Sequence, residues 1–122
     1  MQFKECYQNP FIEERADPYI TLGPDGYYYF TASYPMKSAD DKDGYDRVIL
    51  RRAKDISELA SAEEITIWKV ADTTLTHRFI WAPELHYIAG RWYVFYAGSE
   101  DKENNWAFDC HVLVCDSNDP YT

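Results

Sequence analysis

The sequence is short of cysteines and basic residues, and each shortage excludes a class of protein. Three cysteines among 122 residues, Cys6, Cys110 and Cys115, are too few for a disulfide-dense scaffold. No CxxC pair is present, so we expect reduced thiols and no zinc site. Twelve Lys and Arg against 21 Asp and Glu give a formal net charge of −9. This charge opposes binding to phosphate backbones, so nucleic acid is not an expected partner.

Long apolar runs are also missing. The N-terminal residues MQFKECYQNP hold neither an apolar stretch nor a small-residue cleavage site, so we predict no membrane span and no signal peptide. A cytoplasmic location is therefore expected, with secretion left open in case a leader had been removed. The acidic loop SADDKDGYD, residues 38–46, lacks the residue spacing of a calcium-binding hand, so no metal site is predicted there.

Aromatic side chains are plentiful. Hydrophobic residues make up 46% of the chain and aromatic residues 17%, with eleven Tyr and four Trp. A disordered chain is excluded by this composition, and 122 residues suffice for one domain with a real core. Tyr and Trp favour β-strands, and they also suit the faces of sugars, because each pairs an apolar ring with a polar group.

Extended segments separated by turn residues predict an all-β fold. Residues 17–22 and 27–33 form a hairpin around the turn GPDG, and further strands are predicted at 47–53 and 65–70. One helical turn is predicted within 54–64. The hairpin pattern then returns in WAPELHYIAGRWYVFYAGS, residues 81–99, and is followed by a strand at 108–116.

This repetition is typical of a β-propeller. Aligning Gly26 with Gly90 gives a period of about 64 residues, with four strands in the first unit. We interpret 1–122 as part of one propeller domain, with blade 1 at about 10–70 and a partial blade 2 at about 78–122. Two blades would leave open strand edges, so the remaining blades or self-association are expected to cover them.

Asp17 stands where the first strand begins, and its role has two interpretations. The dipeptide Asp17-Pro18 by itself favours a simple turn. The alignment of Gly26 with Gly90, however, places Asp17 opposite Trp81 of the second unit, at the inner edge of a propeller. A carboxylate beside an indole is what sugar hydrolysis requires, because the ring binds the sugar's C–H surface while the carboxylate activates water.

The motifs RADPYI, DGYYYFTAS and IWAPELHYIAGRWYVFYAG together resemble glycoside hydrolase family 43. The resemblance covers about Asn9 to Tyr121 and implies a five-bladed β-propeller, of which this chain supplies about the first two blades. The α-L-arabinofuranosidase branch of the family is the one that two segments resemble most, NPFIEERADPY and LRRAKDISELASAEEITIWK. Members of the family invert the configuration of the sugar that they release.

The resemblance also implies roles for individual residues. Asp17 matches the general base, and Trp81 matches the tryptophan that lines the sugar pocket, although a core indole is the alternative. Tyr34 matches an aromatic position near the sugar, with a loop role equally open. Glu84 stands where many relatives have Asp, and we expect a pocket-side or structural acid there. Arg15 could favour the ionised state of Asp17 or could be a solvated charge.

The expected activity is thus the removal of terminal α-L-arabinofuranosyl residues from arabinan or arabinoxylan, with an arabinose- or xylose-containing oligosaccharide as ligand. A β-xylosidase and a non-catalytic sugar-binding propeller are the alternatives. The general acid belongs to a later blade, so the 122-residue segment alone is expected to be inactive. No cofactor is expected here, and a channel calcium would also depend on later blades. His77, His86 and His111 are interpreted as structural.

Overall fold

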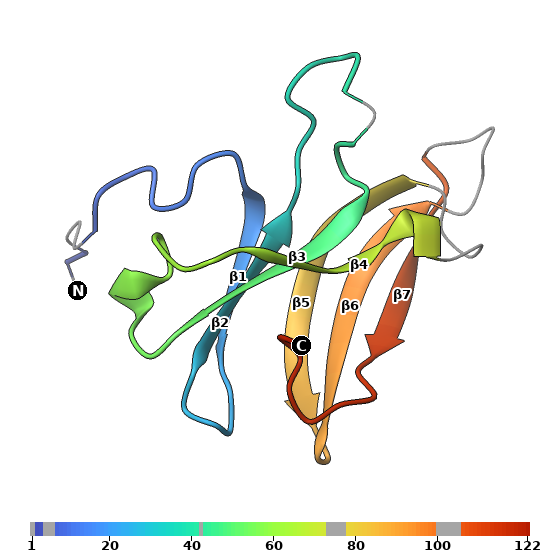
Figure 1. Cartoon of the computed structure of the whole chain (residues 1–122). Helices are drawn as coiled ribbons and strands as arrows, with labels where there is room; N and C mark the ends of the chain where they lie inside the picture. The colour runs from blue at the N-terminus through green and yellow to red at the C-terminus, as the bar shows by residue number, and fades with distance from the viewer. Residues whose placement is uncertain (1, 4–6, 42, 73–77, 100–105) are drawn as a thin grey trace.

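The computed structural model describes residues 2–3, 7–41, 43–72, 78–99 and 106–122, which form two antiparallel sheets (Figure 1). The first sheet has the order β1 (Ala16–Leu22), β2 (Tyr28–Ser33), β3 (Arg47–Ala53) and β4 (Ile65–Lys69). The second has the order β5 (Arg78–Ile88), β6 (Arg91–Ser99) and β7 (Phe108–Val114). Two short 3-10 helices, η1 (Ile56–Glu58) and η2 (Val70–Asp72), flank β4. The predicted all-β architecture is confirmed, and η1 is the predicted helical turn.

The two hairpins that begin the sheets turn in different ways. In the first, Leu22 pairs with Tyr28, so five residues connect the strands. In the second, Ile88 pairs with Arg91, and only Ala89 and Gly90 connect them. Both of these residues have positive φ, +49° and +87°, as the tight hairpin turns favoured by the strand twist require. This difference in connection length affects the alignment of the two repeats, which was made from the sequence by matching Gly26 with Gly90.

The main core lies between the two sheets. Alternate residues of β6, Trp92, Val94 and Tyr96, are buried and pack with Tyr29, Val48 and Leu50 of the first sheet. Period-two alternation directs these side chains to one face of β6. The opposite face of the first sheet is covered separately. There Phe30, Ala32 and Ile49 pack with Leu59 and with Phe11 and Ile12 of the N-terminal segment.

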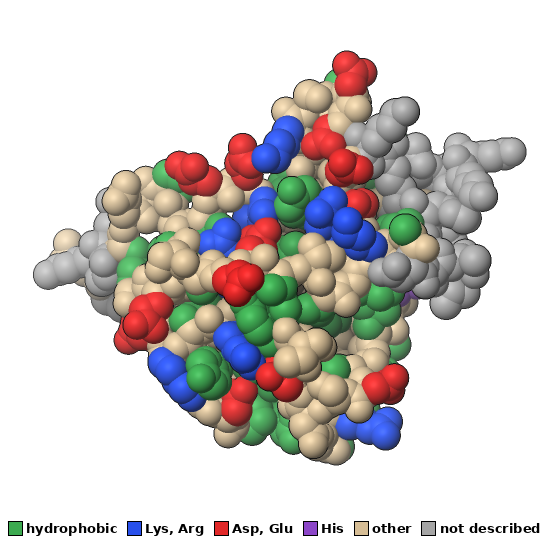
Figure 2. Space-filling model, in the orientation of Figure 1, with side chains coloured by type: hydrophobic (Ala, Val, Ile, Leu, Met, Phe, Trp, Pro, Cys, Tyr) green, Lys and Arg blue, Asp and Glu red, His purple; other side chains and the backbone are tan. Residues whose placement is uncertain are grey.

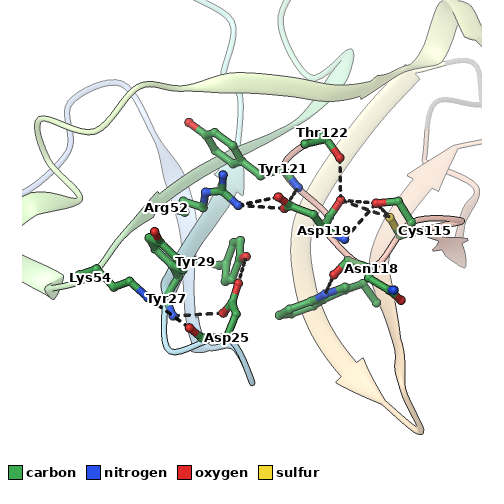
Figure 3. Close-up of polar contacts among 12 residues, drawn as sticks. Asp25, Tyr27, Tyr29, Arg52, Lys54, Cys115, Asn118, Asp119, Tyr121 and Thr122 are labelled. Atoms are coloured by element: carbon green, nitrogen blue, oxygen red, sulfur yellow. Dashed lines mark hydrogen bonds and ion pairs between the residues drawn. The ribbon is translucent and has the colours of Figure 1, made fainter.

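The C-terminal segment is anchored at the end of the sheets that holds the first hairpin turn (Figure 3). Arg52 of β3 donates two hydrogen bonds to the carboxylate of Asp119, at 2.8 and 2.9 Å. The guanidinium also lies 4.5 Å from the centre of the Tyr121 ring, whose hydroxyl donates to the carbonyl of Glu63. Residues 116–121 form bends and a turn, and these contacts return the chain to the first sheet.

Charged side chains of both signs are interspersed on the face shown in Figure 2. The free cysteines Cys110 and Cys115 make no disulfide, while Cys6 and His77 lie outside the described residues. Within the described ranges, no helix has the length and apolar character that crossing a membrane requires.

Candidate functional site

The first strand contains a β-bulge at Asp17 and Pro18. Ala16 pairs with Ser33 and Tyr19 with Thr31, so the two residues between them lie opposite Ala32 alone. Asp17 has φ +51°, in the left-handed region that few residues other than Gly adopt, although Asp does so more often than most. Pro18 lacks the N–H that a bulge leaves without a ladder partner. A non-glycine residue held in this conformation is a feature that concentrates at functional sites.

A β-bulge of the same kind occurs in the second sheet. Trp81 pairs with Ala97 and Glu84 with Phe95, so Ala82 and Pro83 form the bulge. Ala82 has φ +46°, close to the value at Asp17. The backbone therefore matches Asp17-Pro18 with Ala82-Pro83, an offset of 65 residues from position 17 to position 82.

This register corrects the alignment made from the sequence. Matching Gly26 with Gly90 placed Asp17 opposite Trp81, one residue away from its structural counterpart Ala82. The error arises because the two hairpin connections differ in length, so the glycines in the turns do not occupy equivalent positions. Trp81 corresponds instead to Ala16.

A buried hydroxyl joins the two bulges. The Ser33 hydroxyl donates to Oδ2 of Asp17 at 2.8 Å, and the backbone N–H of Ala82 donates to Ser33 Oγ, also at 2.8 Å. Ser33 is fully buried, whereas Asp17 itself is exposed. Among the described residues, none donates a hydrogen bond to Oδ1 of Asp17. The carboxylate is thus fixed through one oxygen, and the other is available to a ligand or to water.

Trp81 lies beside this bridge within a cluster of aromatic rings. Its indole stacks on Phe108, with ring centres 4.4 Å apart and planes 22° apart. Tyr45, Phe79 and Trp106 surround it at centre-to-centre distances of 5.9, 5.7 and 6.1 Å. The indole Nε1 is buried and finds no hydrogen-bond partner within the part of the chain that the structure describes, although a buried donor is normally paired.

Tyr34 occupies a cationic environment. The guanidinium groups of Arg15 and Arg47 lie over its ring, 4.3 and 4.4 Å from the ring centre. Its carbonyl accepts a hydrogen bond of 2.6 Å from the N–H of Tyr45. The ring face is therefore engaged by cations, and a contact between Tyr34 and a sugar would use the ring edge or the hydroxyl.

Arg15 is paired with Glu64, 49 residues further along the chain, rather than with Asp17 or solvent. Arg51 also donates to this carboxylate, at 3.1 Å. Burial opposes ionisation of Glu64, but the two guanidinium groups prevail and lower the pKa of its carboxyl group below the ordinary value. Neither interpretation made for Arg15 from the sequence anticipated this ion pair.

Glu84 is exposed and contacts a histidine. Its Oε2 lies 3.0 Å from Nε2 of His86, whose Nδ1 lies 3.5 Å from the hydroxyl of Tyr19 on β1. The structure thus brings Asp17 and the Trp81–Ala82 segment together, while Glu84 and Tyr34 have their own partners. The sequence interpretation missed Ser33, and the bulge that brings it to Asp17 is signalled only by Pro18 and Pro83.

Comparison with known proteins places these features in a family. The sequence matches the profile of glycosyl hydrolases family 43 over residues 7–122. The chain belongs to family 43. It is 42% identical over 116 residues to an extracellular exo-α-(1→5)-L-arabinofuranosidase of Streptomyces avermitilis, covering 95% of this chain and 22% of that protein. An α-L-arabinofuranosidase structure from Lactobacillus brevis superposes with a TM-score of 0.75 at 40% identity, covering 95% of this chain and 35% of the other.

Less similar family 43 structures agree on the fold. One is a β-xylosidase/α-arabinofuranosidase from a compost metagenome, solved with xylotriose, with a TM-score of 0.68 at 22% identity; it covers 94% of this chain and 36% of that one. The predicted family and propeller fold are thereby confirmed. The chain spans only about a fifth to a third of the length of the relatives it matches.

Proposed function

We propose that this chain is part of the catalytic propeller of an inverting α-L-arabinofuranosidase, with Asp17 as its general base. The observation that carries the proposal is the geometry at Asp17. Asp17 has a left-handed backbone conformation, and its exposed carboxylate accepts a hydrogen bond from the buried Ser33 hydroxyl, directly beside the segment that bears Trp81. The family and the arabinofuranosidase relatives support the choice of reaction.

In the proposed mechanism, the free oxygen of Asp17 takes a proton from a water molecule as that water attacks the anomeric carbon. A general acid on another blade protonates the leaving oxygen, and the two carboxyl groups are separated by roughly 6.5 to 9.5 Å so that the water fits between them. The hydrogen bond from Ser33 orients the base and does not neutralise it. The Trp81 indole would lie against the sugar.

The organisation of the rest of the protein follows the same proposal. The first sheet, within about 10–70, would be blade 1, and the second, within about 78–122, would be most of blade 2. The ligand would be an arabinose-bearing oligosaccharide, and the substrate-binding roles of Tyr34 and Glu84 stay predictions. The Streptomyces avermitilis relative is named extracellular, so the expected cytoplasmic location receives no support from it. Action outside the cell is the location that this relative supports.

The test uses the full-length protein that contains this region. We expect faster hydrolysis of 4-nitrophenyl α-L-arabinofuranoside than of 4-nitrophenyl β-D-xylopyranoside, with NMR showing the inverted anomer as the first product. The 122-residue chain alone should show no turnover of either substrate. Faster hydrolysis of the xyloside would favour the β-xylosidase alternative, and a retained anomer would exclude Asp17 as an inverting base. Binding of arabino-oligosaccharides without hydrolysis would favour a sugar-binding propeller.

A further inference from the structure

The aromatic cluster around Trp81 borders a hollow at the same end of the sheets as Asp17. Met36, Tyr45, Phe79, Trp81 and Trp106 line this hollow of about 350 Å³, within the usual range for small-molecule sites. They come from three places in the chain: the β2–β3 connection, the start of β5 and the segment before β7. Three regions distant in sequence thus contribute large apolar side chains to one concave surface.

The hollow adjoins the proposed catalytic site through a shared residue. Trp81 belongs to its wall, and the next residue, Ala82, donates to the hydroxyl that holds Asp17. The backbone also connects the two, because the N–H of Ile80 donates to the carbonyl of Tyr45 at 2.8 Å. A ligand that places its terminal sugar at Asp17 and Trp81 would therefore extend its next unit toward the hollow.

The lining residues indicate what that unit is. Trp106 packs edge-on against Trp81 and Phe108 at the rim, and 78% of its surface is exposed, so its ring is accessible to a ligand in the hollow. The planes of Tyr45 and Trp106 are tilted by 71° and 67° to that of Trp81, so rings face the hollow from different directions. All five lining side chains are uncharged. An apolar pocket of this kind accepts the C–H surface of a neutral sugar but penalises a carboxylate that finds no partner there.

We propose that Met36, Tyr45, Phe79 and Trp106 form, beside Trp81, a binding subsite for the neutral pentose unit to which the removed terminal sugar is attached. This inference rests on the proposed function, because it takes the Asp17 site as the place where the terminal sugar binds. Charged uronate units are disfavoured at this position of the substrate.

The experiment measures binding rather than hydrolysis, so that it stands apart from the activity. In the full-length protein carrying Asp17→Asn, which keeps the ligand intact, calorimetry compares α-1,5-linked arabinotriose with arabinose. Adding Trp106→Ala should weaken the binding of arabinotriose about tenfold and leave the affinity for arabinose unchanged. Trp106→Phe, which keeps a ring at the rim, should restore affinity to within about twofold of the parent. Tyr7→Ala, at an aromatic residue of the N-terminal segment that is 46% exposed, should change neither affinity.

The outcomes separate this inference from the proposed function. Unchanged arabinotriose affinity in Trp106→Ala would overturn the subsite, even if the protein hydrolyses arabinofuranosides. Equal losses for arabinotriose and arabinose would overturn it as well, because Trp106 would then belong to the terminal-sugar site. The wild-type full-length protein could fail to hydrolyse arabinofuranosides while Trp106→Ala still weakens only arabinotriose binding. That result would uphold the subsite and overturn the catalytic proposal.

Discussion

Two carboxylates stand at opposite ends of the first hairpin and differ in how they are used. In the turn, Asp25 accepts hydrogen bonds at both oxygens: from the Tyr29 hydroxyl at 2.6 Å and from the Tyr27 N–H at 3.1 Å. Both partners lie within four residues of it. At the start of β1, Asp17 accepts from Ser33 through one oxygen only, and the hydroxyl is in turn held by Ala82 of the other sheet.

The difference separates an acid with a structural role from the proposed general base. Both carboxylate oxygens of Asp25 accept hydrogen bonds from residues of its own hairpin. Burial of Tyr29, together with its hydrogen bond to Asp25, raises the pKa of that phenol above its usual value. Asp17 is fixed in orientation by a long-range contact, yet it keeps an exposed oxygen. A carboxylate that is positioned but not fully paired is suited to accept a proton from water.

The largest effect that this comparison predicts is on catalysis. In the full-length protein, Asp17→Asn should lower kcat/KM on an aryl arabinofuranoside on the order of a hundredfold or more, because a positioned base is lost. The matched variant Asp25→Asn, in the same hairpin, should keep activity within a few fold. Initial rates measure both. Equal losses in the two variants would show that the hairpin as a whole, and not the free oxygen of Asp17, governs the rate.

A smaller effect is expected on stability at the Asp25 end. Arg52→Met should lower the free energy of unfolding by about 1 kcal/mol, because the variant removes two hydrogen bonds to a partly exposed carboxylate and a contact with Tyr121. Urea unfolding of the full-length protein provides the measurement, and kcat should not change. Arg91→Met, at the exposed start of β6, is the control and should change little. A loss of activity in Arg52→Met would contradict the division of roles between the two ends.

The smallest effect concerns acid pH. Burial tends to raise the pKa of Asp119, but its bonds with Arg52 and with the N–H of Tyr121 lower it below the ordinary value. A carboxyl group with a lowered folded-state pKa stabilises the fold at pH values above its unfolded pKa of about 3.9 and loses that contribution as the pH falls through the folded value. Asp119→Asn should therefore flatten the decline in Tm below about pH 4. An unchanged slope would mean that this carboxyl group does not couple to unfolding.

The sequence was sufficient to predict the strands, and the burial of β6 alternates along the chain as expected for a strand. It also singled out Asp17, whose role as a general base stays a prediction. It was not sufficient for the register between the two units, because turn length shifted the glycines by one residue relative to the bulges. The ion pair between Arg15 and Glu64 and the aromatic hollow joining Tyr45, Phe79 and Trp106 depend on tertiary contacts between distant segments. No local periodicity encodes such contacts.

The Ser33 bridge has a consequence for the order of folding. The position of Asp17 depends on an N–H that lies 65 residues away in sequence, so the first hairpin can form with the base not yet oriented. Contacts of such long sequence separation form slowly because closing the intervening chain costs entropy. The carboxylate of Asp17 would then be oriented only after the second sheet docks, and a nascent first sheet would carry this acid in an unfixed position.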